Sequence, residues 1–181
     1  MKENSLALQS IPVPEAVRRI ADSKDRKLAW AFFVSFSRME YALKRSGIYL
    51  KAGTDKAEAN WDKFAGDHND LFSPESSQDL ADAVDYFRAN PPRKQLNNGG
   101  AIGWSDPQSY DGKEPLLVWL LRVIRYVRNN LFHGGKFPRI PIDEPSRDRE
   151  LLRHSMVVLS ACVPVGPAAK TFFEDDETGK P

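Results

Sequence analysis

The feature that most constrains the fold is an apolar stretch, PLLVWLLRVIRYVRNNLF, at residues 115–132. At about 100° per residue, one narrow stripe of such a helix contains Leu116, Leu120, Val123, Val127 and Leu131. A second apolar strip on its flank contains Leu117, Leu121 and Phe132. A helix with two apolar surfaces is packed on two sides, and a second chain is one way to cover the second side. The stretch therefore predicts a central helix of a helical domain.

Similar spacing of apolar residues predicts further helices at residues 26–49, 55–72, 75–89 and 146–161. On the first of these, one face contains Leu28, Phe32, Ser35, Met39, Ala42 and Leu43. We find no convincing alternation of period two, which would indicate strands. The predicted fold class is all-α, a single-domain bundle of five or six helices.

Three regions fall outside the regular helical pattern. Residues 1–25 are expected to form an N-terminal arm with a short helix from Pro14 to Ala21. Residues 91–114 form a long loop rich in Gly, Pro and Asn, whose length suggests a functional or partner-facing element. Residues 163–181 are expected to be a flexible C-terminal tail. The helical domain itself would span residues 26–162.

Composition narrows the classes of function. The chain has 181 residues and a net charge of +1, so any nucleic-acid site must be a local basic patch. The single cysteine, Cys162, suits a reducing cytosol, and no signal peptide or membrane-spanning run is visible. His68 and His154 stand apart without metal-ligand spacing. We expect a soluble, cytoplasmic protein that needs no metal or other cofactor and no membrane.

The apolar helix ends in RNNLFHGG, residues 128–135. Gly134 and Gly135 terminate it, because glycine accepts the left-handed conformation at a helix C-cap. Helix-end electrostatics alone could explain the polar residues before them, since His133 near the negative end of the helix dipole is favoured in its protonated form. Arg128 and His133 stand about 140° apart on an ideal helix. They would meet at one ligand only through the long arginine side chain or across a dimer interface.

The pattern R-N-x-x-x-H followed by Gly resembles the R-x4-H motif of the HEPN superfamily, with matches at Arg128, Asn129 and His133. A second segment, EYALKR at residues 40–45, is similar to the E-x3-K-R motif that accompanies R-x4-H in some HEPN families. The resemblance covers roughly residues 26–162. Gly135 stands where HEPN toxins paired with nucleotidyltransferase antitoxins carry a tyrosine, so regulation by modification of that tyrosine is disfavoured.

The resemblance implies a metal-independent endoribonuclease with a composite site at a homodimer interface. His133 would transfer protons, Arg128 would clamp phosphate oxygens, and Asn129 would orient the backbone or the scissile phosphate. RNA is the implied substrate, and a toxin or antiviral defence effector is the implied role, with an antitoxin or other regulatory protein as a further partner. The alternative is a non-catalytic HEPN domain that binds RNA, a nucleotide or a protein. A plain helical dimerisation module is a third hypothesis.

Supporting residues have two interpretations each. Glu40 and Lys44 form a favourable i,i+4 surface pair, which is the simpler explanation for them. Glu40 also falls beside Phe33 and Phe36, where a carboxylate needs a partner, and Arg128 is a candidate. In that case Glu40 orders the site while Lys44 and Arg45 contact RNA. The local basic cluster expected to bind RNA contains Arg122, Arg125, Lys136 and Arg139, together with Arg128.

Overall fold

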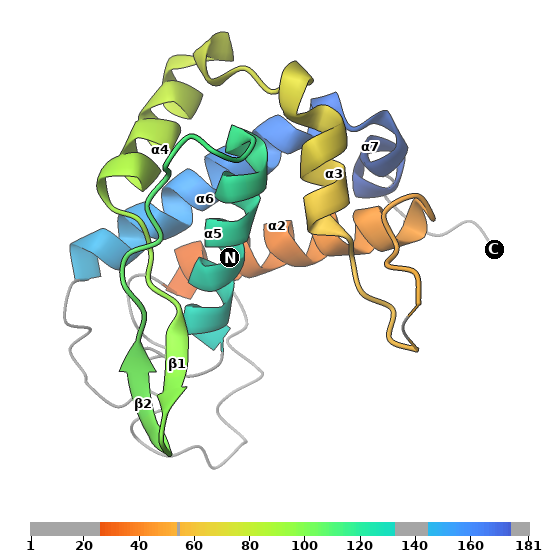
Figure 1. Cartoon of the computed structure of the whole chain (residues 1–181). Coiled ribbons are helices and arrows are strands. Elements are labelled where there is room, and N and C mark those ends of the chain that lie inside the picture. The colour runs from red at the N-terminus through yellow and green to blue at the C-terminus, as the bar shows by residue number, and fades with distance from the viewer. Residues whose placement is uncertain (1–25, 54, 133–144, 175–181) are drawn as a thin grey trace, which may run out of the picture.

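The computed structural model describes residues 26–53, 55–132 and 145–174. Within them the α-helices are α2 (Arg26–Arg45), α3 (Trp61–His68), α4 (Gln78–Ala89), α5 (Leu116–Phe132), α6 (Pro145–Val165) and α7 (Pro167–Glu174). Two 3-10 turns, Asn69–Leu71 and Pro74–Ser76, lie between α3 and α4, and a small antiparallel hairpin consists of β1 (Gln95–Asn98) and β2 (Ala101–Trp104). The predicted all-α class is confirmed (Figure 1).

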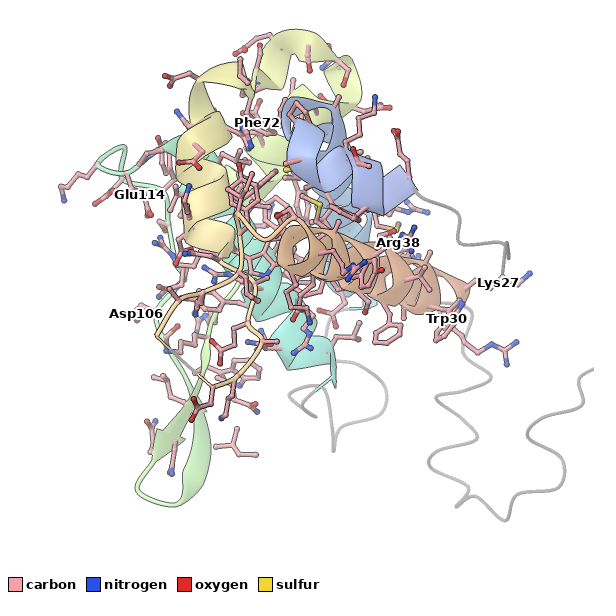
Figure 2. All side chains as sticks on the ribbon, turned by 90° about the vertical axis from the view of Figure 1, so that its right-hand side faces the viewer. Lys27, Trp30, Arg38, Phe72, Asp106 and Glu114 are labelled. Carbon is pink, nitrogen blue, oxygen red and sulfur yellow. The ribbon has the colours of Figure 1, made fainter. Side chains whose placement is uncertain are left out.

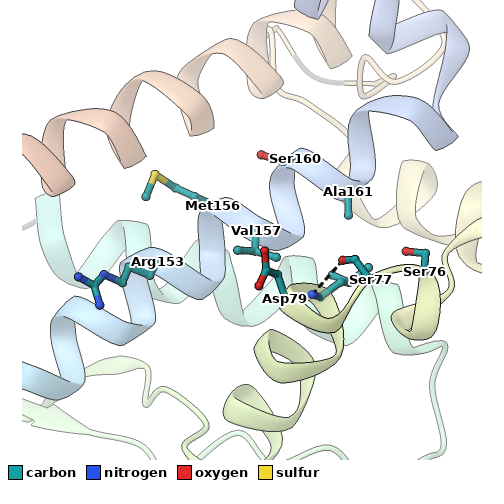
Figure 3. Close-up of a pocket in the computed structure, with 9 residues that line it drawn as sticks. Ser76, Ser77, Asp79, Arg153, Met156, Val157, Ser160 and Ala161 are labelled. Carbon is teal, nitrogen blue, oxygen red and sulfur yellow. Dashed lines mark hydrogen bonds between the residues drawn. The ribbon is translucent and has the colours of Figure 1, made fainter.

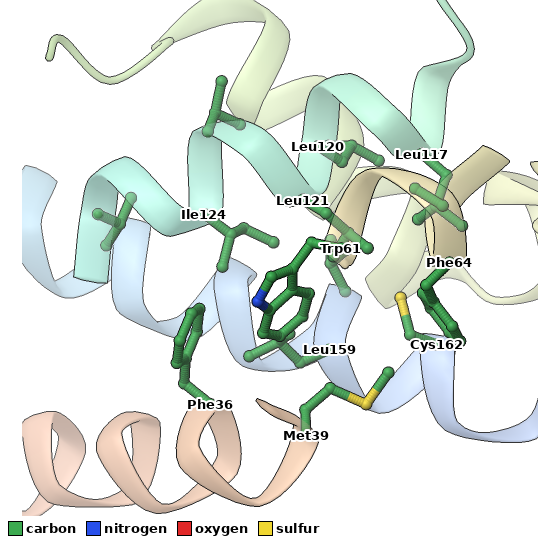
Figure 4. Close-up of a cluster of buried hydrophobic side chains, with 14 of the residues drawn as sticks. Phe36, Met39, Trp61, Phe64, Leu117, Leu120, Leu121, Ile124, Leu159 and Cys162 are labelled. Carbon is green, nitrogen blue, oxygen red and sulfur yellow. The ribbon is translucent and has the colours of Figure 1, made fainter. Parts of the chain in front are cut away.

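The helices pack around α5 and α6. Helix α2 lies against α6 and α7, α4 lies against α6, and α3 lies against α5. The core between them contains large apolar side chains of α2, α3, α4, α5 and α6, including Phe36, Met39, Trp61, Phe64 and Leu159 (Figure 4). Removing this apolar surface from water is the main stabilising contribution.

Helix α5 is buried on two sides, as its two apolar strips predict. Leu120 and Leu117, one from each strip, are both fully buried, and Leu121 is 1% exposed. Other helices of the same chain therefore cover the second strip at Leu117 and Leu121, and no second chain is needed to bury these two leucines. The side chain of Phe132 lies outside the described part of the chain.

Several predicted helix boundaries are wrong: α3 ends at His68 instead of residue 72, and α4 begins at Gln78 instead of residue 75. Helix α2 ends at Arg45 instead of residue 49, because Ser46 donates its hydroxyl to the Leu43 carbonyl (2.7 Å) and Gly47 adopts a φ of 71°. Residues 55–60 are not helical: α3 begins at Trp61, where the Asn60 side chain accepts a hydrogen bond of 3.1 Å from the Lys63 amide as an N-cap. Before α3, Leu50 and Ala59 form an isolated antiparallel bridge.

The segment at residues 91–114, predicted to be a long loop, contains the β-hairpin. Its turn is at Gly99 and Gly100, whose φ angles of 62° and 93° are both positive, as a two-residue type I′ turn requires. The strands are only four residues each. A pattern of that length is too short to stand out as an alternation.

The tail prediction is wrong for residues 163–174. Helix α6 continues through Pro164 to Val165, and α7 follows after Gly166. Pro167 stands at the first position of α7, where a missing backbone N–H costs nothing. Helix α7 packs on α2, and Arg38 of α2 donates a hydrogen bond of 2.9 Å to the Phe173 carbonyl (Figure 2). Only Pro167 is at a position that helices tolerate, whereas Pro164 lies inside the last turn of α6, where it cannot donate a backbone hydrogen bond.

Other predictions fall outside the described residues. These concern the arm and short helix at residues 1–25 and the tail at 175–181. Among the described helices no single one is long and apolar enough to cross a membrane. The pair 146–165 and 167–174 meets the length and composition criteria together, with a bend of 114° between the two helices.

Candidate active site

The last turns of α5 carry the residues that match the R-x4-H motif. Val127 and Asn130 point inward and are 6% and 8% exposed, respectively. Arg128 is half-buried and Asn129 is exposed. The buried apolar stripe of α5 therefore fixes the rotation of the helix, and this rotation leaves Arg128 and Asn129 at the rim of the core.

Arg128 contacts its neighbour and the other motif-bearing helix. Its Nη1 donates a hydrogen bond of 3.1 Å to the Asn129 side-chain oxygen. Its guanidinium carbon also lies 5.6 Å from the centre of the Phe36 ring on α2, a cation–π contact. The flat guanidinium is thereby held against a buried aromatic ring.

The residues of the second motif follow Phe36 along α2. Glu40 lies one helical turn beyond Phe36, on the same side of the helix. Its carboxylate is 3.7 Å from Lys44 Nζ, so the predicted i,i+4 pair is present. The expected Glu40–Arg128 pair is not what the structure shows, because Glu40 pairs along its own helix and Arg128 lies over Phe36. Arg45 lies 5.7 Å from the Phe172 ring of α7.

Two of the arginines expected to bind RNA have acidic partners. Arg122 makes a bidentate ion pair with Glu114, and one of its two bonds measures 2.6 Å. The Glu114 pair raises the pKa of Arg122 further, so the guanidinium stays charged. Arg125 binds the Asp62 carboxylate at 2.6 Å and so links α5 to α3. These pairs neutralise both arginines, which weakens the predicted basic cluster on α5.

The remaining predicted site residues are His133, Lys136 and Arg139. All three lie outside the described residues, as do the two glycines after His133. The structure therefore brings together Arg128, Asn129 and the α2 helix that carries Glu40 and Lys44. The position of His133 stays a prediction.

Asn130 is a residue that sequence reasoning missed. Its side-chain amide donates a hydrogen bond of 2.9 Å to the Arg93 carbonyl at the base of the hairpin. The sequence does contain a signal for it, because position 130 is one helical turn after Val127 of the apolar stripe. A polar side chain at such a position needs a hydrogen-bond partner. The structure supplies that partner from the long loop.

Other candidate groups have structural surroundings. His68 accepts or donates a hydrogen bond of 2.9 Å with the Tyr49 hydroxyl, and burial lowers the pKa of its imidazole. Burial also lowers the pKa of His154, which stacks on Tyr86 and lies 3.7 Å from Glu150. Cys162 is fully buried in the core, as expected for a packing residue. Among the described residues no cluster of three or more His, Cys, Asp or Glu side chains is arranged to hold a metal ion.

A surface hollow of about 570 Å³ lies between α4 and α6 (Figure 3). Its charged lining residues are Asp79 and Arg153, and Arg153 is paired with Glu150 at 3.1 Å. None of the predicted site residues lines the hollow. The hollow therefore does not coincide with the candidate site at the end of α5.

Comparison of the chain with protein-family models, with curated proteins and with solved structures gave no match.

Proposed function

We propose that the chain is a metal-independent endoribonuclease of HEPN type, with a composite site formed by two copies of the chain. The observation that carries the proposal is the contact between Arg128 and Phe36. It places the end of α5, which bears Arg128 and Asn129, against the helix that bears Glu40 and Lys44. The first motif thus lies beside the helix that bears the second, one helical turn before Glu40.

The proposed chemistry follows from the residue types. Cleavage by the 2′-hydroxyl needs a base for that proton, an acid for the 5′-oxygen and a cation for the charged intermediate. Arg128 supplies a permanent cation with paired donors, which fit phosphate oxygens in two-point contacts. Asn129, exposed beside it, offers an amide for the scissile phosphate. His133 would move the protons, and a second copy of His133 would divide the acid and base roles.

The role in the cell follows from the same proposal. A ribonuclease of this type would act as a toxin or an antiviral defence effector in the cytoplasm, with RNA as substrate and a regulatory protein to hold it in check. The alternative is a non-catalytic domain that binds RNA, a nucleotide or a protein. The ion pairs of Arg122 and Arg125 favour the protein-binding form of this alternative, because they leave fewer cations on α5 for RNA.

The test is RNA cleavage in EDTA by the purified protein and its variants. We expect cleavage by the unchanged chain and losses of at least about 100-fold in His133→Ala and Arg128→Ala. Arg88→Ala is the matched control, because Arg88 is an exposed arginine of α4 whose ion pair is with Asp85 on the same helix. Cleavage that survives either site substitution in an intact dimer would contradict the assignment, and cleavage abolished by EDTA would contradict the metal-free mechanism.

A mixing experiment tests the shared site. Arg128→Ala and His133→Ala chains are each inactive by this proposal, but their heterodimer brings one intact arginine and one intact histidine into the same cleft. We expect part of the activity to return when the two chains are unfolded and refolded together. A mixture as inactive as its components would contradict a shared site that works with one arginine and one histidine of the pair.

A further inference from the structure

The hairpin carries an exposed face of defined composition. Gln95 pairs with Trp104 and Asn97 pairs with Ile102, and alternate residues of a strand face opposite sides. These four side chains therefore share one face, with an aromatic ring, an aliphatic side chain and two amides. Ile102 is 72% exposed and Trp104 is 42% exposed.

The opposite face of the hairpin, which carries Leu96, Asn98, Ala101 and Gly103, has no aromatic side chain. There Gly103 has no side chain, and the Asn98 amide lies so close that a Cβ atom at position 103 would collide with it. Asn98 thus covers the middle of that face, next to Leu96. Only the Trp104 face presents an open aromatic surface. Among the described residues no other ring stacks on Trp104.

The charged residues of the hairpin segment, residues 91–105, are all basic. Residues 91–105 contain Arg93 and Lys94 but no acidic residue. In the described part of the chain neither cation has an ion-pair partner, in contrast to Arg122 and Arg125. Charge complementarity therefore favours an anionic occupant for this surface.

The hairpin is fixed beside the candidate site. Asn130 holds the Arg93 carbonyl from the last turns of α5, directly after Asn129 in the chain. Ser105 and Lys94, which flank the two strands at the end away from the turn, are also hydrogen-bonded. The Ser105 amide donates to the Lys94 carbonyl (2.8 Å), and the Ser105 hydroxyl accepts from the Lys94 amide (2.9 Å). In Figure 1 the strands project from the body next to the lower end of α5.

We propose that the hairpin is a platform for single-stranded RNA. A base stacks on Trp104, and the Gln95 amide and the Asn97 Nδ2 group bind base edges, while the Asn97 Oδ1 accepts from the Gly100 amide (2.8 Å). Arg93, on this face by the alternation of the strand, and Lys94, whose long side chain starts from the opposite face, contact phosphates. The inference rests on the proposed function for its ligand class and adds where the strand lies. A protein strand added to a hairpin edge would use backbone groups and would leave both cations unpaired, so the side chains favour RNA.

The experiment measures binding without cleavage. The probe is a labelled single-stranded RNA of about ten nucleotides, 2′-O-methylated so that its 2′-oxygen cannot attack the phosphate. Fluorescence anisotropy gives the dissociation constant for the full chain and its variants. We expect Trp104→Ala to bind about tenfold more weakly and Trp104→Phe to retain most of the affinity, because phenylalanine still stacks.

Two further variants sharpen the test. In Arg93→Gln/Lys94→Gln we expect weaker binding and a salt dependence whose slope is shallower by about 1.4, because each phosphate that the protein neutralises contributes about 0.7 to the slope. Trp30→Ala is the matched control, because Trp30 is 64% exposed but lies on α2 (Figure 2). Unchanged affinity in Trp104→Ala and the double variant, or no binding by the full chain, would overturn the platform.

The experiments can contradict the RNA platform and the proposed nuclease activity independently of each other. If the hairpin variants weaken binding but the chain never cleaves RNA, the platform stands and the proposed catalysis is wrong. If the chain cleaves RNA in EDTA but the hairpin variants bind the probe as the full chain does, the platform is wrong and the nuclease stands.

Discussion

The side-chain amide of Asn130 donates a hydrogen bond of 2.9 Å to the backbone carbonyl of Arg93. The bond joins the last turns of α5 to the base of the hairpin, two segments that lie far apart in the sequence. Asn130 is 8% exposed, so its amide has little access to water as a substitute partner. This buried side chain, together with the bond from Arg147 to the Pro91 carbonyl, therefore ties the base of the hairpin to the helical body beside Arg128 and Asn129.

Replacing Asn130 with alanine should destabilise the protein by about 1 kcal/mol, because the hydrogen bond to the Arg93 carbonyl is lost. The hairpin should also become more mobile, with faster hydrogen exchange at the amides of β1 and β2. Urea unfolding followed by circular dichroism measures the first effect, and exchange with mass-spectrometric detection measures the second.

The neighbouring asparagine provides the control. Asn129 is exposed, so Asn129→Ala should change the free energy of unfolding by no more than about 0.5 kcal/mol. By the proposed function it should nevertheless reduce RNA cleavage. Equal losses of stability in the two variants would show that the structural role assigned to Asn130 is wrong.

The sequence was sufficient to predict those elements whose apolar period is long. The stripe on α5 and the face of α2 that holds Phe32 and Met39 repeat over several turns, and both are buried where the period places them. The short elements could not be predicted this way. Helix α7 and the hairpin strands have too few residues for a period, and α7 is stabilised by packing on α2 instead.

The site could be predicted only as residue types at a spacing. The sequence indicates that Arg128 and Asn129 end a helix, but it does not show what their side chains contact. Arg128 lies over Phe36, and Arg122 and Arg125 bind Glu114 and Asp62. Such pairings depend on which helices are neighbours, and that is decided by the packing of the whole chain.

The Arg122–Glu114 pair gives a second prediction. Both side chains are about two-thirds buried, and the contact is bidentate, so a double-mutant cycle with Arg122→Gln and Glu114→Gln should give a coupling energy of about 1 kcal/mol. Stability would be measured by urea unfolding of the four proteins. Arg122→Gln alone should weaken binding of the RNA probe less than Arg93→Gln/Lys94→Gln does. A coupling energy near zero would return Arg122 to the set of candidate RNA contacts.

Cys162 gives a third prediction. Burial raises the pKa of its thiol to about 12, so the native protein holds a neutral, inaccessible thiol. A thiol reagent should label the native chain only at the rate at which it opens, and should label the chain in denaturant at once. Cys162→Ser should cost about 1–3 kcal/mol, because a hydroxyl replaces the thiol among apolar side chains. Rapid labelling of the native protein would contradict the packing around Cys162.

Stability should fall when the solution is acidified from about pH 7 to about pH 5, in part because of His68. Burial lowers the pKa of His68 below its ordinary 6.5, and Lys63 adds to this effect while Asp67 opposes it. In this window the unfolded chain binds a proton more readily than the folded one, so protonation favours unfolding. The loss begins as the pH falls through about 6.5, and it is complete below the lowered pKa of the folded state.

His154 changes in the same direction, because burial also lowers its pKa. The free energy of unfolding should therefore be measured between about pH 5 and about pH 8 for His68→Gln, His154→Gln and the double variant. Glutamine in place of His68 still offers a polar partner to the Tyr49 hydroxyl, which bonds His68 at 2.9 Å. We expect each single variant to flatten the pH dependence in part and the double variant to flatten it further. An unchanged slope in the double variant would mean that neither histidine is held neutral by the fold.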